Sequence, residues 1–256
     1  RFVWNLLCGI PFLTPTFTYH THVDHHMRKH YGTERDGEYL PLAVRPPRHL
    51  FYYFCQPLFM PILAVVRFLV LVPLSWVSTR FRDFAHAHMS SMVINLNYVR
   101  PLPTDKQRRT FRLQEVGCFL FLLGAALLVL RGRDPFTPAL VVQAYLTAVG
   151  VLMLNHLRTL GAHRYINGSG DEMTFVDQLL DSVNYPQARP WLVLSMPVGL
   201  RYHALHHLCP SLPYHALGAA HRRLMAELPA DSPYRQTVSP SLWASLSALW
   251  RSSWSV

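Results

Sequence analysis

The chain has 256 residues, a formal net charge of +10, 50% hydrophobic residues and a mean hydropathy of only +0.12. This low average hides long apolar runs that alternate with arginine- and histidine-rich stretches, a pattern that favours an integral membrane protein over a soluble globule. The basic residues are spread between the apolar runs, and their densest cluster is only KQRR (106–109), so nucleic-acid binding is disfavoured. The four cysteines form no C-x-x-C pair, which argues against a zinc ribbon or a disulfide framework.

The first segment, residues 2–19, is apolar and leads directly into a histidine-rich stretch, YHTHVDHH (19–26). This stretch contains four histidines and one carboxylate, namely His20, His22, Asp24, His25 and His26. The chain begins with Arg, directly inside an apolar segment, so we expect further sequence upstream.

Three further apolar runs determine the expected membrane topology. Residues 116–130 and 138–154 are uninterrupted and are expected to form a transmembrane helical hairpin. Residues 51–77 contain three prolines and Arg67, so we expect a proline-broken hairpin that re-enters the membrane or lies in its interface. All the histidine-rich stretches then share one side of the membrane. The concentration of basic residues on that side indicates the cytoplasm.

Polar candidate residues resume after the hairpin. NHLRTLGAHRY (155–165) contains His156 and His163, which on a helix would lie about 10 Å apart along its axis. His163 is the stronger candidate ligand, and His156 is either a ligand or a hydrogen-bond donor behind one. Asp177 and Asp181 follow at i and i+4. With Asp24, they are candidates to accept the outer N–H of ligand imidazoles, although solvated carboxylates would show the same spacing.

A second H-x-x-H-H stretch, YHALHH (202–207), lies nearer the C-terminus. The two matching sets are therefore His22, His25 and His26, and His203, His206 and His207. On a helix this spacing brings imidazoles to one face, and neutral imidazole binds iron, zinc and copper. Two such stretches could enclose two metal ions. The chain has neither the H-E-x-x-H of zinc proteases nor the Glu-x-x-His pairs of soluble diiron bundles.

The last expected element is the tryptophan-rich segment PSLWASLSALWRSSWSV (240–256). As a helix it would place Leu242, Trp243, Leu246, Leu249 and Trp250 on one face. Such a face suits either the lipid headgroup region or packing on the domain itself.

Three stretches, HVDHH, GAHRY and RYHALHHLCPSLPYHALGAAHRRL, resemble the second histidine box, the intervening histidine and the third box of the membrane fatty acid desaturase superfamily. This resemblance implies an all-α integral membrane protein with a cytosolic histidine-rich diiron cap, formed here by a single desaturase-like domain over residues 1–256. The implied ligands are His22, His25, His26, His163, His203, His206 and His207, with His20 as a weaker extra. The superfamily's first box has no good counterpart here, which again suggests upstream sequence.

The resemblance also implies an activity. Two iron ions would activate O₂ and remove hydrogen from a C–H bond of a lipid acyl chain, with electrons from a separate donor such as ferredoxin or a cytochrome. The main prediction is a fatty acyl desaturase. A lipid or carotenoid hydroxylase or ketolase of the same superfamily is the alternative, because all these reactions begin with hydrogen abstraction. The alternative from another class is a non-catalytic metal-binding or transport protein, but transporters place ionisable ligands within their spans, whereas these histidines flank them.

Overall fold

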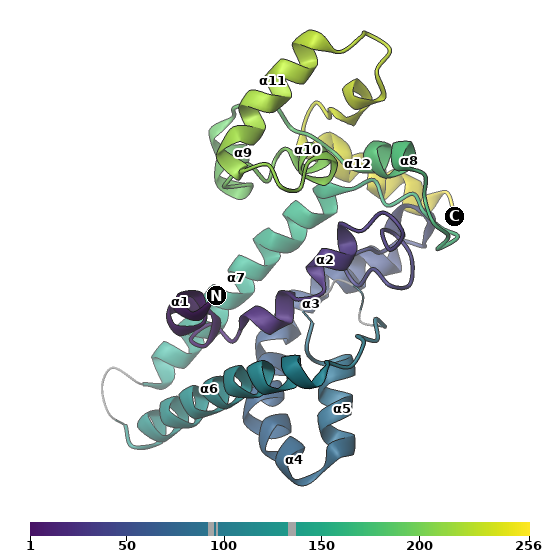
Figure 1. Ribbon diagram of the computed structural model, residues 1–256. Helices are drawn as coiled ribbons and strands as arrows, with labels where there is room; N and C mark the ends of the chain where they lie inside the picture. The colour runs from purple at the N-terminus through teal and green to yellow at the C-terminus, as the bar shows by residue number, and fades with distance from the viewer. Residues whose placement is uncertain (92–94, 96, 133–136) are drawn as a thin grey trace. The chain divides into compact units, whose positions relative to one another are not determined.

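The computed structural model describes residues 1–256 except 92–94, 96 and 133–136. The described residues form α-, 3₁₀- and π-helices joined by turns, without any strand among them (Figure 1). Three helical segments are long and apolar enough to cross a membrane: Arg48–Val77, Asp105–Leu130 and Pro138–Ala162. The prediction of an all-α fold with membrane helices is therefore confirmed.

The chain divides into two compact units, each built from two separate stretches of sequence. Unit 1 comprises Arg1–Val23 and Cys55–Val151, and unit 2 comprises Asp24–Phe54 and Leu152–Val256. Neither unit is continuous in sequence, and the single domain expected over residues 1–256 stays a prediction. Helices α2 (His22–His25), α3 (Arg48–Val65) and α7 (Pro138–Ala162) each contribute residues to both units.

Two long helices of unit 1 begin at clear sequence signals. Thr104 and Gln107 form a capping box at the start of α6 (Asp105–Leu130), in which each side chain satisfies a free backbone N–H of the other. Pro138 is the first residue of α7, where its missing N–H costs nothing. Only 17% and 6% of their most apolar windows are buried, as expected for helices that face lipid. The two apolar runs expected to form a hairpin, 116–130 and 138–154, lie within these two helices.

The segment from Arg48 to Val77 differs from the expectation. It is helical throughout, as α3, the π-helix η4 (Val66–Leu71) and α4 (Val72–Val77), so the hairpin expected within residues 51–77 is not there. Pro57 and Pro61 lie inside α3, and Pro73 lies in the first turn of α4, where proline is tolerated. The chain instead reverses at Ser78, and α5 (Thr79–His88) runs back beside α4 (Figure 1).

The interior of unit 1 contains both an apolar cluster and a buried ion pair. Phe17, Phe68 and Phe111 pack with two smaller residues, Val72 of α4 and Cys118 of α6. Arg67 is 3% exposed and pairs with Glu115 of α6, and its guanidinium also donates to the Met89 carbonyl. The arginine in the middle of the apolar run thus avoids lipid by pairing within the protein. Short helices open the unit: α1 (Phe2–Trp4), η1 (Asn5–Gly9) and η2 (Thr16–Tyr19).

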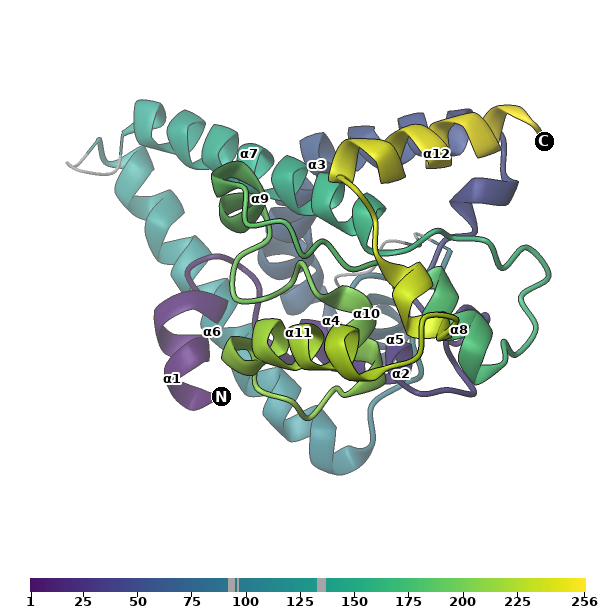
Figure 2. The same ribbon diagram turned by 90° about the horizontal axis from the view of Figure 1, so that it is seen from above.

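Unit 2 carries most of the histidines on short helices joined by extended segments. Beyond α2, it contains η3 (Leu42–Val44), α8 (Phe175–Asp181), α9 (Pro190–Ser195), α10 (His203–Leu208), η5 (Tyr214–Ala216), α11 (Leu217–Glu227), η6 (Pro233–Thr237) and α12 (Leu242–Trp254). The fully buried Asn184 connects its own extended segment to η6 and to α10. Its backbone and side chain bond to Thr237, and its Oδ1 accepts from Leu205 N–H of α10. Figure 2 shows α10 beside α11.

The C-terminal helix α12 divides the residues that the sequence placed on one face. Leu242 and Leu249 are buried. Leu242 and the partly buried Leu246 pack in a cluster that includes Tyr185 and Leu192 of unit 2. Trp243 and Trp250 are exposed. The helix therefore packs on its own unit through leucines, and its tryptophans remain on the outside.

Candidate metal centre

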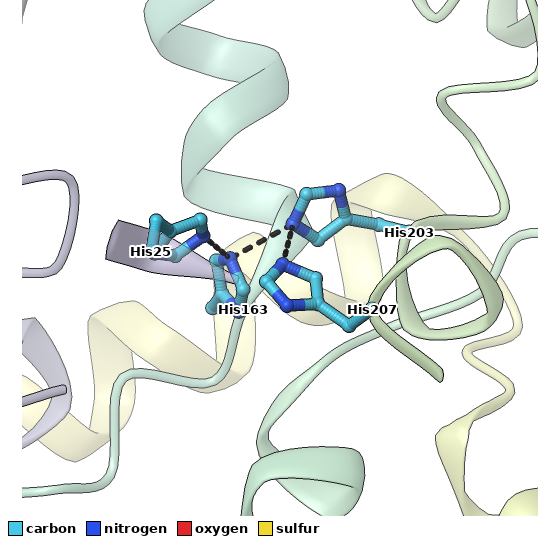
Figure 3. Close-up of side chains that lie close together, drawn as sticks. All are labelled: His25, His163, His203 and His207. Carbon is cyan, nitrogen blue, oxygen red and sulfur yellow. Dashed lines mark hydrogen bonds between the residues drawn. The ribbon is translucent and has the colours of Figure 1, made fainter. Parts of the chain in front are cut away.

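Four imidazoles from three separate segments of unit 2 converge on one point. His203 and His207 lie at i and i+4 on α10 and therefore share a face. His163 directly follows α7, and a backbone bridge to Ser182 holds it in place. His25 is the last residue of α2. Figure 3 shows the four rings facing one another.

The distances between the ring nitrogens suit a metal ion. Nε2 of His163 lies 3.2 Å from Nε2 of His25 and 2.9 Å from Nε2 of His203. Nε2 of His207 lies 3.0 Å from Nε2 of His203. An ion bound at about 2.1 Å from each nitrogen would place neighbouring ligands about 3 Å apart at right angles. The four nitrogens thus have the spacing of adjacent ligands on one metal.

Hydrogen bonds behind two of the rings show which nitrogens carry protons. Asp36 lies 2.8 Å from Nδ1 of His25, and a carboxylate accepts, so this nitrogen donates. Tyr31 donates to Asp181 over 2.6 Å, and its oxygen lies 2.7 Å from Nδ1 of His163, which therefore donates to it. In the neutral rings, Nε2 of His25 and of His163 then both present lone pairs. A metal ion between these two lone pairs would be bound by both, so these residues fit a metal.

The carboxylates and phenols around the cluster are buried. Asp36 is 1% exposed and Asp181 is 0% exposed. Besides Tyr31, Asp181 accepts from the hydroxyl of Tyr39 at 3.2 Å and from the backbone N–H of Ile166. Buried carboxylates behind metal-bound histidines fix the orientation of the rings and raise their basicity.

Electrostatics keeps most of the cluster neutral. Burial lowers the pKa of His203 and His207 well below the ordinary value, and charge on neighbouring histidines lowers it further. Burial also lowers the pKa of His163, against the opposing effect of Asp181. At His25, burial favours the neutral ring, but the Asp36 carboxylate outweighs it and raises the pKa. Neutral imidazole is the form that binds metals.

A second histidine group lies on the other face of α10. The rings of His26 and His206 are 4.6 Å apart between centroids, and His26 also lies 4.5 Å from His207. His206 is 8% exposed. His22 opens α2 in unit 1, one helical turn before His26 along the chain, and its part in this group stays a prediction from its spacing.

The structure places other candidates away from the cluster. The exposed His20 accepts from the side-chain amide of Gln107. His156 is buried, but its Nδ1 bonds to the Leu152 carbonyl one turn earlier and its ring lies 4.4 Å from that of Tyr53. Neither residue joins the groups of ligand atoms found among the described residues.

The three candidate carboxylates have different environments. Asp24 bonds to His30 at 3.1 Å. Asp177 bonds to Thr174, the N-cap of α8, which accepts from the Asp177 backbone N–H and donates to its carboxylate. Only Asp181 lies behind a histidine of the cluster, with its Oδ2 3.5 Å from Nδ1 of His163. The i, i+4 spacing of Asp177 and Asp181 therefore did not place them in one environment.

Sequence reasoning missed three residues that support the cluster: Asp36, Tyr31 and Tyr39. They lie in YGTERDGEY (31–39), a polar loop without metal-ligand spacing. The glycine-containing turn does carry a signal in retrospect. Gly32 has a φ of +71°, and its N–H donates to the Asp36 carboxylate that holds His25.

Comparison with known proteins agrees with this geometry. A family model described as fatty acid desaturase matches residues 1–238. A protein of Caulobacter vibrioides (strain NA1000 / CB15N) named "Ceramide hydroxylase" is 38% identical, over 98% of this chain and 71% of the relative. No solved structure matches the chain significantly. With its apolar helices and buried histidine cluster, the chain therefore belongs to the fatty acid desaturase family and is an integral membrane oxidoreductase.

Proposed function

We propose that this protein hydroxylates the hydrocarbon part of a ceramide-like lipid, with O₂ as co-substrate and a diiron centre held by its histidines. The observation that carries the proposal is the convergence of four buried imidazoles at 2.9–3.2 Å between neighbouring Nε2 atoms. The relative named ceramide hydroxylase supports hydroxylation more than the desaturation expected from the sequence. A fatty acyl desaturase is the second candidate, because both reactions begin with removal of hydrogen from the same kind of C–H bond.

The ligand assignment follows the two histidine groups. His25, His163, His203 and His207 hold one iron. His26 and His206, together with His22 by its spacing, hold the other. Bound iron supplies the reduction of O₂ and the removal of hydrogen from the lipid. Electrons come from a separate donor protein of the ferredoxin or cytochrome type, and the histidine-bearing face lies in the cytoplasm.

The chain's own groups keep this centre ordered and dry. Asp36 accepts the proton of Nδ1 of His25. The Tyr31 hydroxyl donates to Asp181 and accepts from Nδ1 of His163. Both rings therefore present Nε2 to the metal. Tyr31 and Tyr165 are at most 1% exposed and exclude water on one side. Burial and the nearby carboxylates raise the pKa of both phenols well above the ordinary value. They therefore remain protonated hydrogen-bonding groups at any working pH.

The test uses the protein expressed from its complete gene, supplied with ceramide and a reducing system. Mass spectrometry of the lipids should show a product with one added oxygen atom. A product that has lost two hydrogen atoms instead would establish the desaturase. Iron content of the purified protein is measured in parallel.

Two variants make the metal assignment specific. His203→Ala should lose most bound iron and all product, because the substitution removes a side chain that binds the metal directly. His215→Ala removes an exposed histidine outside both groups and should retain iron and product. Unchanged iron content in His203→Ala would refute the assigned site.

A further inference from the structure

Unit 1 contains a cavity that the histidine centre does not use. Its volume is about 400 Å³. It is lined by residues from the end of α4, from α5 and from the first turns of α6: Ser75, Trp76, Arg82, His86, Arg108, Arg109, Arg112 and Glu115. Arg82 comes from α5 and three further arginines from α6, so the positive charges converge from two helices.

The single carboxylate of this lining does not neutralise the arginines, because it is already paired. Glu115 forms a buried ion pair with Arg67 from behind the cavity. Arg108 already has partners within the protein: its Nε donates to the Pro103 carbonyl, and its Nη1 lies 3.8 Å from Asp83. Arg82, Arg109 and Arg112 supply the remaining positive charge.

Two buried polar atoms of the lining lack a protein partner. Within the described part of the chain, Nε of Arg82 and Nδ1 of His86 are buried and have no hydrogen-bond partner. The whole His86 side chain is only 4% exposed. Buried polar atoms are nearly always satisfied, so each of these points to a ligand that accepts or shares a hydrogen bond.

The cavity lies where unit 1 changes from polar to apolar. The first turns of α6 are polar up to Glu115, and the uninterrupted apolar run begins at Val116. Trp76 is half exposed, and Leu113 and Leu120 are exposed beside the arginine-bearing turns. Tryptophan is enriched at the level of lipid headgroups. A ligand here would meet arginines with one end and apolar side chains with the other.

From this arrangement we propose that the cavity of α4, α5 and α6 binds a phosphate group, as carried by an anionic phospholipid headgroup or by free phosphate. Guanidinium groups bind phosphate with paired, parallel hydrogen bonds, and arginine is the preferred residue for it. A cavity of this volume has room for a phosphate group with part of the molecule that carries it. The exposed leucines favour the lipid as the source.

The test measures thermal stability of the full-length protein in detergent. Phosphatidylglycerol is added in one arm, inorganic phosphate in a second and diacylglycerol, a lipid without phosphate, in a third as the reference. Stabilisation by phosphatidylglycerol alone identifies the lipid headgroup, and stabilisation by inorganic phosphate identifies the free anion. Either result supports a phosphate site. No stabilisation beyond the diacylglycerol reference in either arm overturns it.

Paired variants locate the effect. Arg82→Gln with Arg112→Gln should weaken the apparent affinity about tenfold or more, since hydrogen bonds to charged groups are lost. The control, Arg80→Gln with Lys106→Gln, removes the same charge from exposed positions of α5 and α6 outside the cavity. It should respond as the wild type does. Arg82→Lys with Arg112→Lys preserves the charge and should recover part of the response, which separates binding from misfolding. An equal response of the glutamine pair and the wild type, or equal loss in both glutamine pairs, overturns the site.

Discussion

Asp36 and Asp181 are the carboxylates that hold histidine protons in this protein. Asp36 acts directly on His25, whereas Asp181 acts on His163 mainly through the Tyr31 hydroxyl. Burial by itself would raise the pKa of both carboxyls, but His25 and His163 respectively, with backbone N–H donors, lower it. Both therefore remain ionised acceptors inside the protein.

The first prediction concerns Asp36→Asn. The amide can donate as well as accept, so it no longer requires the proton of His25 to be on Nδ1. Iron affinity and product formation should both fall about 10- to 100-fold, the usual cost of losing such a partner. Iron titration of the purified variant measures the first effect. Asp171→Asn, at an exposed position of unit 2, is the control and should match the wild type.

The second prediction uses His221, which lies outside both histidine groups. Burial and two nearby arginines lower its pKa in the folded protein, and its Nδ1 lies 2.7 Å from the Tyr234 hydroxyl. His221 therefore binds its proton more tightly in the unfolded chain than in the folded protein. His221 therefore lowers stability as the pH falls from about 6.5 towards the folded pKa, and leaves it unaffected above 6.5.

His221→Gln removes this proton-binding group. The variant should show a smaller loss of thermal midpoint than the wild type between pH 7.5 and 5.5, as measured by scanning fluorimetry in detergent. The other histidines are present in both proteins, so the difference isolates His221. Identical pH profiles would show that His221 does not contribute.

At the scale of elements, the histidine box on α10 supplies histidines to both groups, whereas its spacing predicted that they would share one face. The i, i+4 pair of His203 and His207 faces His163, while His206 at i+3 faces His26. One short helix thus contributes histidines to both groups, which would not be possible if all three imidazoles pointed to the same side of the helix. The same helix is held in place by the hydrogen bond of Leu205 N–H to Asn184.

The third prediction concerns the contact of η4 with α6 in unit 1. Arg67→Met leaves Glu115 buried without its ion-pair partner and should lower the free energy of unfolding by about 3–5 kcal/mol. Arg67→Met combined with Glu115→Leu should recover most of this loss, because no buried charge remains. Denaturant titration in detergent measures both. Arg80→Met, at an exposed position of α5, should change stability by less than about 0.5 kcal/mol. Equal stability of the two Arg67 variants would contradict the pairing argument.

At the scale of the whole molecule, the cluster constrains membrane topology. His25 precedes all three candidate spans and His163 follows them, yet their Nε2 atoms are 3.2 Å apart within unit 2. Two residues of one site lie on one side of the membrane, so the number of crossings between them is even. Of the three candidate helices, therefore, either two cross the membrane or none does, and at least one does not.

The segment Arg48–Val77 is the one that we expect not to cross. Arg67, in its middle, is paired with Glu115 at the polar start of α6, so this part of the segment lies at the level where α6 enters the membrane. The hairpin expected from the sequence within residues 51–77 would give the same topology, but the structure does not contain it. A continuous helix that stays within one leaflet also leaves an even number of crossings between His25 and His163.

The fourth prediction tests this topology by labelling single cysteines in a background without Cys8, Cys55, Cys118 and Cys209. Cysteines at Glu34, Arg80 and Asp171 should all be labelled from the cytoplasmic side, and one at Arg131 from the other side. All four positions are exposed. If positions 34 and 80 were labelled from opposite sides, Arg48–Val77 would cross the membrane.

The sequence by itself determined the all-helical class, the membrane helices and the two histidine stretches that are candidate metal ligands. It could do so because the length of an apolar run and the H-x-x-H-H spacing are local properties. It also indicated His163, since that histidine directly follows a long apolar helix. It also singled out His20, His156 and Asp177, whose hydrogen bonds in the structure lie outside the two histidine groups: Gln107, far along the chain, for His20, and residues within one helical turn for the other two.

Only the tertiary structure decided which of these residues meet. Asp36 and Tyr31 lie on a loop with no ligand spacing, and they reach the histidines because unit 2 brings residues 24–54 against residues 152–256. The same holds for Arg67, which a hydropathy plot reads as an interruption and the fold pairs with Glu115. Hydrophobic length and helical period act over a few turns, whereas hydrogen-bond partners and buried charges are chosen by contacts between segments far apart in the chain. For that reason the chemistry of the ligands could be read from the sequence, and the residues that hold their protons could not.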